Sequence, residues 1–238
     1  MPSTAQLSLP LVMPAQAQKH VTVNQALAIL DTVTQLRVNG SNTSTPPDGA
    51  TGGDAYIVPA GATGAWVDQA DSVAVWSNGG WTFLEPRHGW RAWDVGLSGW
   101  QLYDGTAWVP NALAVSAGGA RIVARVLEFD HQIAAGATNL TTVLIPAGAQ
   151  VLGISSRVEA ALTGTALTGW RIGVAGSDNR YGSGLGLARN AYLAGLSGSP
   201  VTYYAATPLL LSAEGGTFSS GTVRLAVHLV EISPPRAV

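Results

Sequence analysis

The stretch that decides the fold consists of two short runs of strand-forming residues joined by a turn, and it reads Val73-Ala74-Val75-Trp76-Ser77-Asn78-Gly79-Gly80-Trp81-Thr82-Phe83-Leu84. β-Branched and aromatic residues favour strands on both sides, and Asn78-Gly79 tolerates the positive φ angles of a tight turn. Further along, the run from Leu102 to Trp108 repeats the scheme of aromatic residue, Asp-Gly turn and aromatic residue. We therefore predict a small module of β-hairpins over residues 54–112.

Tryptophan is concentrated in this module, which holds seven of the eight in the chain: Trp66, Trp76, Trp81, Trp90, Trp93, Trp100 and Trp108. Full burial of one tryptophan side chain contributes roughly 4–6 kcal/mol, so most of them are expected to form a small aromatic core. The functional alternative is that one or two face solvent as flat surfaces for sugar rings.

Residues 119–238 contain strand-like runs separated by turn residues. They are 121–129, 141–145, 150–158, 169–174, 201–205, 208–213 and 222–232. Seven short strands at this spacing predict a β-sandwich or jelly roll. The Gly-rich stretch 182–186 lacks both the spacing and the Lys-Ser/Thr ending of a phosphate-binding loop, and we expect it to be a flexible loop.

Residues 1–40 are expected to hold an arm and a short helix. Pro10 and Pro14 cannot donate backbone hydrogen bonds, so 7–14 is predicted to be extended. From Thr22, apolar residues recur every three or four positions and predict an amphipathic helix that ends near Val38, before Asn39-Gly40; they are Val23, Ala26, Leu27, Leu30, Val33 and Leu36. Residues 41–53, rich in Ser, Thr, Asn, Pro and Gly, are expected to be a linker.

The composition argues for self-association. Charged residues make up 11% of the chain, whereas about 25% is usual, and hydrophobic residues make up 47%. We expect much of the apolar surface to be covered by other copies of the chain. The net charge is −2 and the single lysine and eleven arginines are scattered, so no nucleic-acid partner is expected. Without a signal peptide or a long apolar run, neither export nor membrane insertion is expected.

We expect no metal site, no cofactor and no catalytic activity. The four histidines, His20, His88, His131 and His228, are isolated in the sequence. No cysteine is present. Glycan cleavage would need two carboxylates about 5–10 Å apart, and the spacing of Glu85, Asp94 and Asp104 does not single out such a pair.

The first half of the chain resembles an alphaproteobacterial family of uncharacterised domains found in tail or spike proteins of prophages and gene transfer agents. The residues that carry the resemblance are Leu9-Pro10-Leu11-Val12, Ala15-Gln16-Ala17-Gln18-Lys19-His20-Val21-Thr22-Val23-Asn24, Gly53-Asp54-Ala55-Tyr56-Ile57-Val58, Ala62-Thr63-Gly64-Ala65-Trp66 and Gly89-Trp90-Arg91-Ala92-Trp93. The second half is similar to the β-domain that follows this module, with landmarks Ile145-Pro146-Ala147-Gly148, Arg180-Tyr181-Gly182 and Tyr203-Tyr204-Ala205.

The resemblance implies a homotrimeric virion subunit, made in the bacterial cytoplasm, that attaches to other virion proteins through its N-terminal part. It implies no catalytic residue. Aromatic side chains beside polar ones favour a tail fibre or spike that binds a host surface polysaccharide, and the candidate contacts are Trp90, Arg91, Trp93, Asp94, Tyr103, Asp104, Asn179, Arg180, Tyr181, Arg189 and Tyr192. A purely structural adaptor or decoration protein and a glycan depolymerase are the alternatives.

Overall fold

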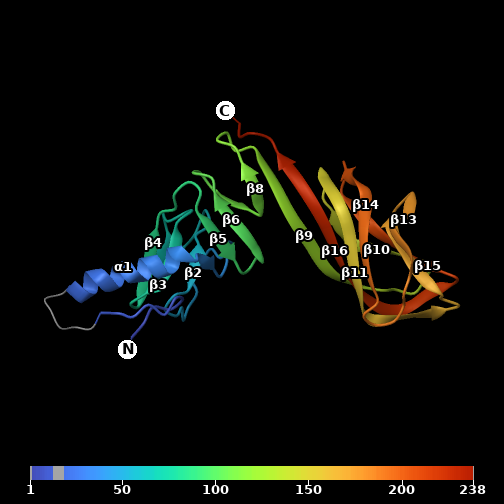
Figure 1. Cartoon of the computed structure of the whole chain (residues 1–238), viewed down its shortest axis with the longest axis horizontal. Helices are drawn as coiled ribbons and strands as arrows, with labels where there is room; N and C mark the ends of the chain where they lie inside the picture. Colours follow the sequence, from blue (N-terminus) through green and yellow to red (C-terminus); the bar gives the residue numbers. More distant parts are fainter. Residues whose placement is uncertain (1, 13–18, 238) are drawn as a thin grey trace. The chain divides into compact units, whose positions relative to one another are not determined.

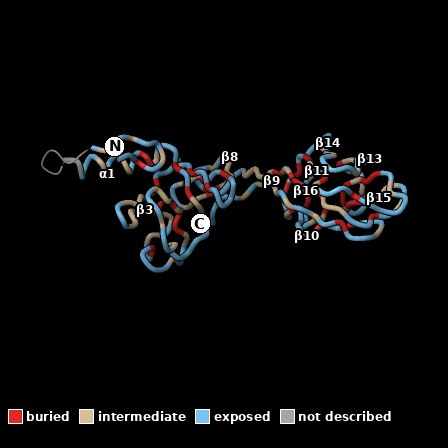
Figure 2. The backbone as a smooth tube through the Cα atoms, turned by 90° about the horizontal axis from the view of Figure 1, so that it is seen from below, coloured by how far each residue is buried: buried red, intermediate tan, exposed pale blue. Residues whose placement is uncertain are grey.

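The computed structural model describes residues 2–12 and 19–237, and it is mainly β, as predicted. The chain forms two compact units, Met1–Ala112 and Leu113–Val238, here called unit 1 and unit 2 (Figure 1). In each unit the buried segments run through the interior (Figure 2). Residues 13–14 of the expected arm and 15–18 of the family motif lie outside the described residues.

Unit 1 contains the helix α1 (Lys19–Thr34), a short 3-10 helix (Gly64–Trp66) and two sheets. One sheet has the order β1-β5-β6-β7, formed by Arg37–Val38, Arg91–Asp94, Gly99–Tyr103 and Trp108–Pro110. The other has the order β2-β3-β4, formed by Ala55–Ile57, Val73–Ser77 and Gly80–Leu84. Residues 41–53 run as an irregular loop within this unit.

Both predicted hairpins are confirmed. In the β3–β4 hairpin Trp76 lies opposite Trp81, and Asn78 and Gly79 have φ angles of 51° and 79°. These positive values are the ones that a two-residue turn demands, which explains the Asn-Gly dipeptide. In the β6–β7 hairpin Tyr103 lies opposite Trp108.

Aromatic packing supports unit 1, as expected. Trp66 is fully buried, and its ring meets that of Trp81 edge to face, with centroids 5.1 Å apart. Trp81 makes a second edge-to-face contact with Trp76 at 5.1 Å. Offset and edge-to-face geometries suit the ring quadrupoles, so this cluster adds to the burial energy of the aliphatic core beside it.

The helix ends earlier than the periodicity predicts, at Thr34 rather than near Val38. Arg37 and Val38 instead form β1, which pairs in parallel with Trp93 and Asp94 of β5. Val38 is fully buried in this position. Its burial in a sheet outweighs the weak local preference for continuing the helix.

Part of the apolar stripe of the helix faces solvent, whereas two of its polar residues are buried. Val23 and Leu30 are 42% and 52% exposed, but Asp31 and Thr32 are only 3% exposed. Asp31 is buried because it anchors the N-terminal arm. Its carboxylate accepts hydrogen bonds from the Thr4 hydroxyl at 2.7 Å and from the backbone N–H groups of Gln6 and Leu7 at 2.9 and 2.6 Å.

The described part of the arm is folded back on itself and not extended as predicted. Thr4 donates its backbone N–H to Leu9, and Leu11 donates to Pro2. The side chain of Asn24 exchanges two hydrogen bonds with the backbone of Val12. Polar helix residues therefore hold the arm, which local proline chemistry alone did not reveal.

Asp31→Ala should release the arm. The Thr4 hydroxyl and two amide groups would lose their acceptor, at a cost of about 1–3 kcal/mol, so hydrogen exchange at Gln6 and Leu7 should speed up about tenfold or more. Asp48→Ala, at an exposed position without such bonds, is the matched control. Unchanged exchange at both amides would contradict the anchoring role.

The same anchor should depend on pH. Burial alone would raise the pKa of the Asp31 carboxyl, but the hydrogen bonds from Thr4, Gln6 and Leu7 together lower it below its ordinary value. A lowered folded-state pKa means that the stabilisation is present above the unfolded pKa and is lost as the pH falls through the folded one. Protection of the arm amides is therefore expected to be lost only as the pH falls below 3.8, the ordinary pKa of the Asp carboxyl.

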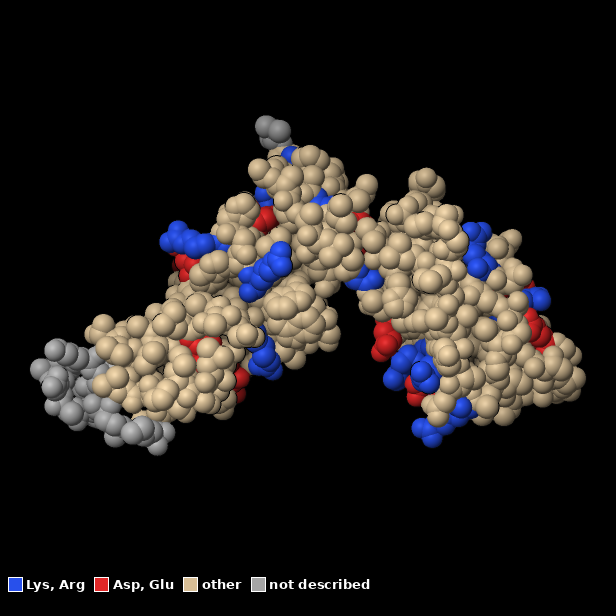
Figure 3. All heavy atoms as spheres, viewed as in Figure 1, with Lys and Arg blue, Asp and Glu red and all other residues tan. Residues whose placement is uncertain are grey.

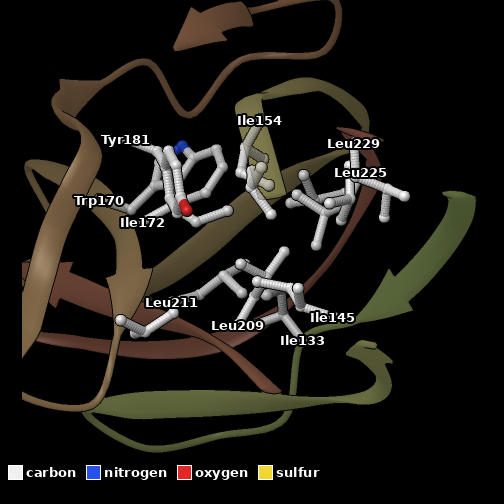
Figure 4. Close-up of a cluster of buried hydrophobic side chains, with 14 of the residues drawn as sticks. Ile133, Ile145, Ile154, Trp170, Ile172, Tyr181, Leu209, Leu211, Leu225 and Leu229 are labelled. Carbon is white, nitrogen blue, oxygen red and sulfur yellow. The ribbon is translucent and has the colours of Figure 1, made fainter. Parts of the chain in front are cut away.

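Unit 2 is a β-sandwich whose two sheets enclose one core. The four-stranded sheet has the order β10-β15-β12-β13, formed by Thr138–Ile145, Thr207–Glu214, Gly169–Val174 and Ser177–Leu185. The five-stranded sheet has the order β14-β11-β16-β9-β8, formed by Tyr192–Tyr203, Ala149–Thr165, Thr217–Ser233, Arg121–Gln132 and Ala112–Val115. Figure 4 shows side chains from both sheets, among them Trp170, Leu211 and Leu225, pointing into the shared core.

The stretch 182–186, predicted to be a flexible loop, lies largely in strand β13, which pairs with β12. Its glycines hide the strand from a propensity argument. A Cβ atom at Gly182 would lie 3.0 Å from a methyl group of Leu193, so that side chain would have to shift to admit it. Glycine at this position thus leaves room for the leucine side chain of the neighbouring strand β14.

Candidate functional site

An exposed pair of tryptophans is the main candidate binding surface of unit 1. Trp93 on β5 lies directly opposite Trp100 on β6, with ring centroids 5.3 Å apart and planes at 79°. The two residues are 37% and 54% exposed. Because large aromatics are usually buried where the fold allows it, an exposed cross-strand pair indicates a recognition surface.

Strand alternation places this pair outward. In β5 the exposed residues Arg91 and Trp93 alternate with the fully buried Ala92 and Asp94. Arg37 of β1 is the register partner of Trp93 and is also exposed. Successive side chains of a strand point to opposite faces, so Trp93, Trp100, Arg37 and Arg91 share one face. We call these four residues the tryptophan platform.

Asp94 supports the platform from beneath and does not face solvent. One carboxylate oxygen accepts the backbone N–H of Leu97 at 3.1 Å, and the other accepts the side-chain amide of Gln101 at 3.2 Å. The same amide donates to Ser41 at 2.9 Å. The prediction that Asp94 contacts a ligand is therefore wrong, because its burial commits it to shaping the β5–β6 turn.

Three other predicted ligand contacts of unit 1, Trp90, Tyr103 and Asp104, also make contacts within the protein. Trp90 is half-buried against the core, and Tyr103 is half-buried with its ring against that of Trp108. The carboxylate of Asp104 accepts the backbone N–H groups of Thr106 and Ala107 and so closes the β6–β7 turn. Of the six predicted contacts in this unit, the structure brings only Arg91 and Trp93 together on the platform.

Trp100 and Arg37 were missed by the sequence analysis. A signal for Trp100 existed, since a hairpin between Trp93 and Trp100 would place the two rings opposite each other. For Arg37 no such signal existed, because its position depends on the parallel pairing of β1 with β5, residues far apart in the chain.

The predicted contacts in unit 2 do not form one site. Asn179 and Arg180 are exposed on β13, Arg189 is exposed in the loop before β14, and Tyr192 is 73% exposed at the start of β14. Tyr181 is only 4% exposed. Its assignment as a ligand contact is wrong because its hydroxyl lies inside the sandwich, 2.6 Å from that of Tyr203.

The tyrosine pair should matter for stability. Burial, followed by the hydrogen bond with Tyr203, raises the pKa of Tyr181, so the Tyr181 hydroxyl stays neutral. Tyr181→Phe leaves the buried Tyr203 hydroxyl without its partner and should lower the free energy of unfolding by about 1–3 kcal/mol.

Urea denaturation of single and double variants checks this pair. Replacing both tyrosines by phenylalanine should recover part of the loss, because no buried hydroxyl is then left unpaired. Tyr204→Phe, at a position that is 90% exposed, should have no effect. Strictly additive losses in the double variant would show that the hydroxyls are not coupled.

Within residues 2–12 and 19–237, no group of three or more His, Asp or Glu side chains is placed to hold a metal ion. In the same part of the chain, no helix is long and apolar enough to cross a membrane.

Most of unit 1 matches a known protein family. Residues 23–109 match the model of a protein family of unknown function, DUF2793, and this range includes the whole tryptophan platform. No curated protein matches the chain significantly. A solved chain titled "Cyanophage Pam1 capsid asymmetric unit" aligns with 47% of this chain and 84% of its own length at 21% identity. Its TM-score is 0.32, a likeness too loose to bear on function.

Proposed function

We propose that this protein is a non-enzymatic virion subunit of a phage or gene transfer agent that binds a host surface glycan through the tryptophan platform. The exposed Trp93–Trp100 pair carries the glycan part of the proposal. The virion part rests on the family resemblance of residues 7–110, and the family match at residues 23–109 covers the same region.

The chemistry of the platform suits a sugar chain. A pyranose ring has a face of weakly positive C–H groups that packs on the negative face of an aromatic ring. Two rings at 79° form an angular surface rather than a flat one, so they can contact a sugar from two sides. Arg37 and Arg91 are hydrogen-bond donors at the same face, suited to sugar hydroxyls or to acidic groups.

Combined replacement of Trp93 and Trp100 by alanine should abolish glycan binding at the tryptophan platform. The variant and the unmodified chain would be applied to an array of bacterial capsular and lipopolysaccharide-derived glycans. For a glycan that protects the tryptophans of the unmodified chain from acrylamide, affinity should fall about 100-fold, as expected for losing two central aromatic contacts. Protection of tryptophan fluorescence from acrylamide by the same glycan should disappear as well.

Tyr204→Ala, which removes an exposed aromatic residue of unit 2, is the matched control and should bind normally. Unaltered affinity of the double tryptophan variant for a glycan that protects the tryptophans of the unmodified chain would refute the platform. If no array glycan binds and acrylamide quenching is unaffected, the results would favour the hypothesis of a purely structural adaptor. Falling viscosity of a capsule solution in the presence of the protein would instead favour the depolymerase.

Homotrimer formation is the second part of the proposal. Exposed apolar side chains remain on the described surface of both units, among them Val21, Leu30, Val126, Leu196 and Ile232. Figure 3 shows charged side chains as small scattered groups between wide uncharged areas. Subunit contacts would remove such apolar areas from water.

Light scattering at micromolar concentration should therefore give about three times the chain mass of 24.4 kDa. Three copies would also multiply weak sugar contacts, with avidity gains of about 10²–10⁴ where the geometry allows simultaneous binding. A monomeric mass across the concentration range would contradict the proposed homotrimer but not the proposed binding role of the tryptophan platform.

A further inference from the structure

Unit 2 has a hollow of about 410 Å³ on the outer face of its five-stranded sheet. Its lining comes from four neighbouring strands, β14, β11, β16 and β9, and the side chains that matter are Tyr192, Ser155, Arg157, Glu159, Arg224 and Glu128. The volume falls within the roughly 300–1,000 Å³ that is typical of small-molecule sites. We call it the outer-face hollow.

An exposed aromatic ring stands at one side of the hollow. Tyr192 is 73% exposed, and the guanidinium of Arg157 lies 5.6 Å from its ring centroid. This is within the range of a cation–π contact, which orients the ring. Arg157 itself is held by a hydrogen bond to the carbonyl oxygen of Asn190 at 3.2 Å. The ring is thus positioned while most of its surface stays open to a ligand.

The charges around the hollow are close to balanced. Arg224 makes a two-pronged hydrogen bond with Asp130, at 2.7 and 2.9 Å, and lies 3.8 Å from Glu159. Hydrogen bonding from Arg224 lowers the pKa of Asp130, so the pair stays ionised. Glu128 also lines the hollow, and its carboxylate has no hydrogen-bond partner among the described residues.

Donors and acceptors are therefore both present, together with an aromatic surface. Glu128 is an acceptor, Arg157 retains donors beyond its bond to Asn190, and the Ser155 hydroxyl, 2.9 Å from the imidazole of His228, is both. Only a ligand that itself combines donors, acceptors and an apolar face can use all of these groups at once. Hydroxyl-rich sugars have this combination.

Two other ligand classes fit less well. A phosphate or carboxylate ligand would meet the carboxylates of Glu128 and Glu159, and the guanidinium of Arg224 is already engaged by Asp130. A divalent cation prefers a cluster of carboxylate oxygens, and no such cluster is found in the described part of the chain.

We propose that the outer-face hollow is a second carbohydrate site, specific for a neutral oligosaccharide, with the Tyr192 ring as its stacking surface and Glu128 as its hydroxyl acceptor. It extends the proposed function to unit 2 but is independent of the tryptophan platform, because no residue is shared between the two.

Saturation-transfer difference NMR on the full chain tests the site. The probes are neutral hexasaccharides of glucose, mannose and N-acetylglucosamine at millimolar concentration. We expect binding of at least one probe by the Trp93→Ala/Trp100→Ala variant, which lacks the platform. Adding Tyr192→Ala to that variant should weaken this binding about tenfold or more. Adding Glu128→Gln, which keeps the shape but removes the charge, should also weaken it.

Tyr204→Ala in the same background is the control, and it should bind like its parent. The site is refuted if no hexasaccharide binds the platform-free variant, or if Tyr192→Ala leaves binding unchanged. Displacement of a bound probe by millimolar inorganic phosphate would overturn the neutral specificity. Failure of the platform would instead appear as glycan binding that leaves acrylamide quenching of the unmodified chain unchanged, so the two proposals fail separately.

Discussion

The two-residue period of extended strands is the constraint on which both candidate surfaces depend. In β5 it buries Ala92 and Asp94 while turning Arg91 and Trp93 outward. In β16 it directs Leu225 and Val227 into the sandwich and leaves Arg224 on the opposite face. A shift of either strand by one residue would exchange core and surface, so hydrophobic burial and the proposed ligand recognition rely on the same register.

The chain has few charged residues, and several of them form ion pairs between strands. Three of the pairs in unit 2 join neighbouring strands: Arg224 with Asp130, Arg125 with Glu231, and Arg171 with Asp178. All are partly exposed, so their contribution to stability is modest. Wide uncharged areas lie between the charged groups, as Figure 3 shows for one face, and these areas are open to the aromatic and apolar contacts that the proposed functions require.

Local chemistry made part of the candidate site predictable. Trp93 and Arg91 were identified because aromatic and polar groups lie close together in the sequence. Asp94 and Tyr181 have equally suitable neighbours, yet both are buried. Composition cannot separate these cases, since a polar group can serve either as an internal hydrogen-bond partner or as a ligand contact, and only the strand register decides which. The outer-face hollow joins residues from strands that are distant in the chain and had no local signal.

The sequence by itself determined the mainly β class and the two hairpins, because β-branched and aromatic runs around Asn-Gly and Asp-Gly turns act through short-range backbone preferences. Tertiary structure decided where the helix stops, since Val38 gains more from burial in β1 than from another helical turn. It also turned the glycine-rich stretch at 182–186 into part of β13 and folded the arm back onto Asp31. These outcomes depend on close approach and hydrogen bonding between segments far apart in the chain, which no local pattern encodes.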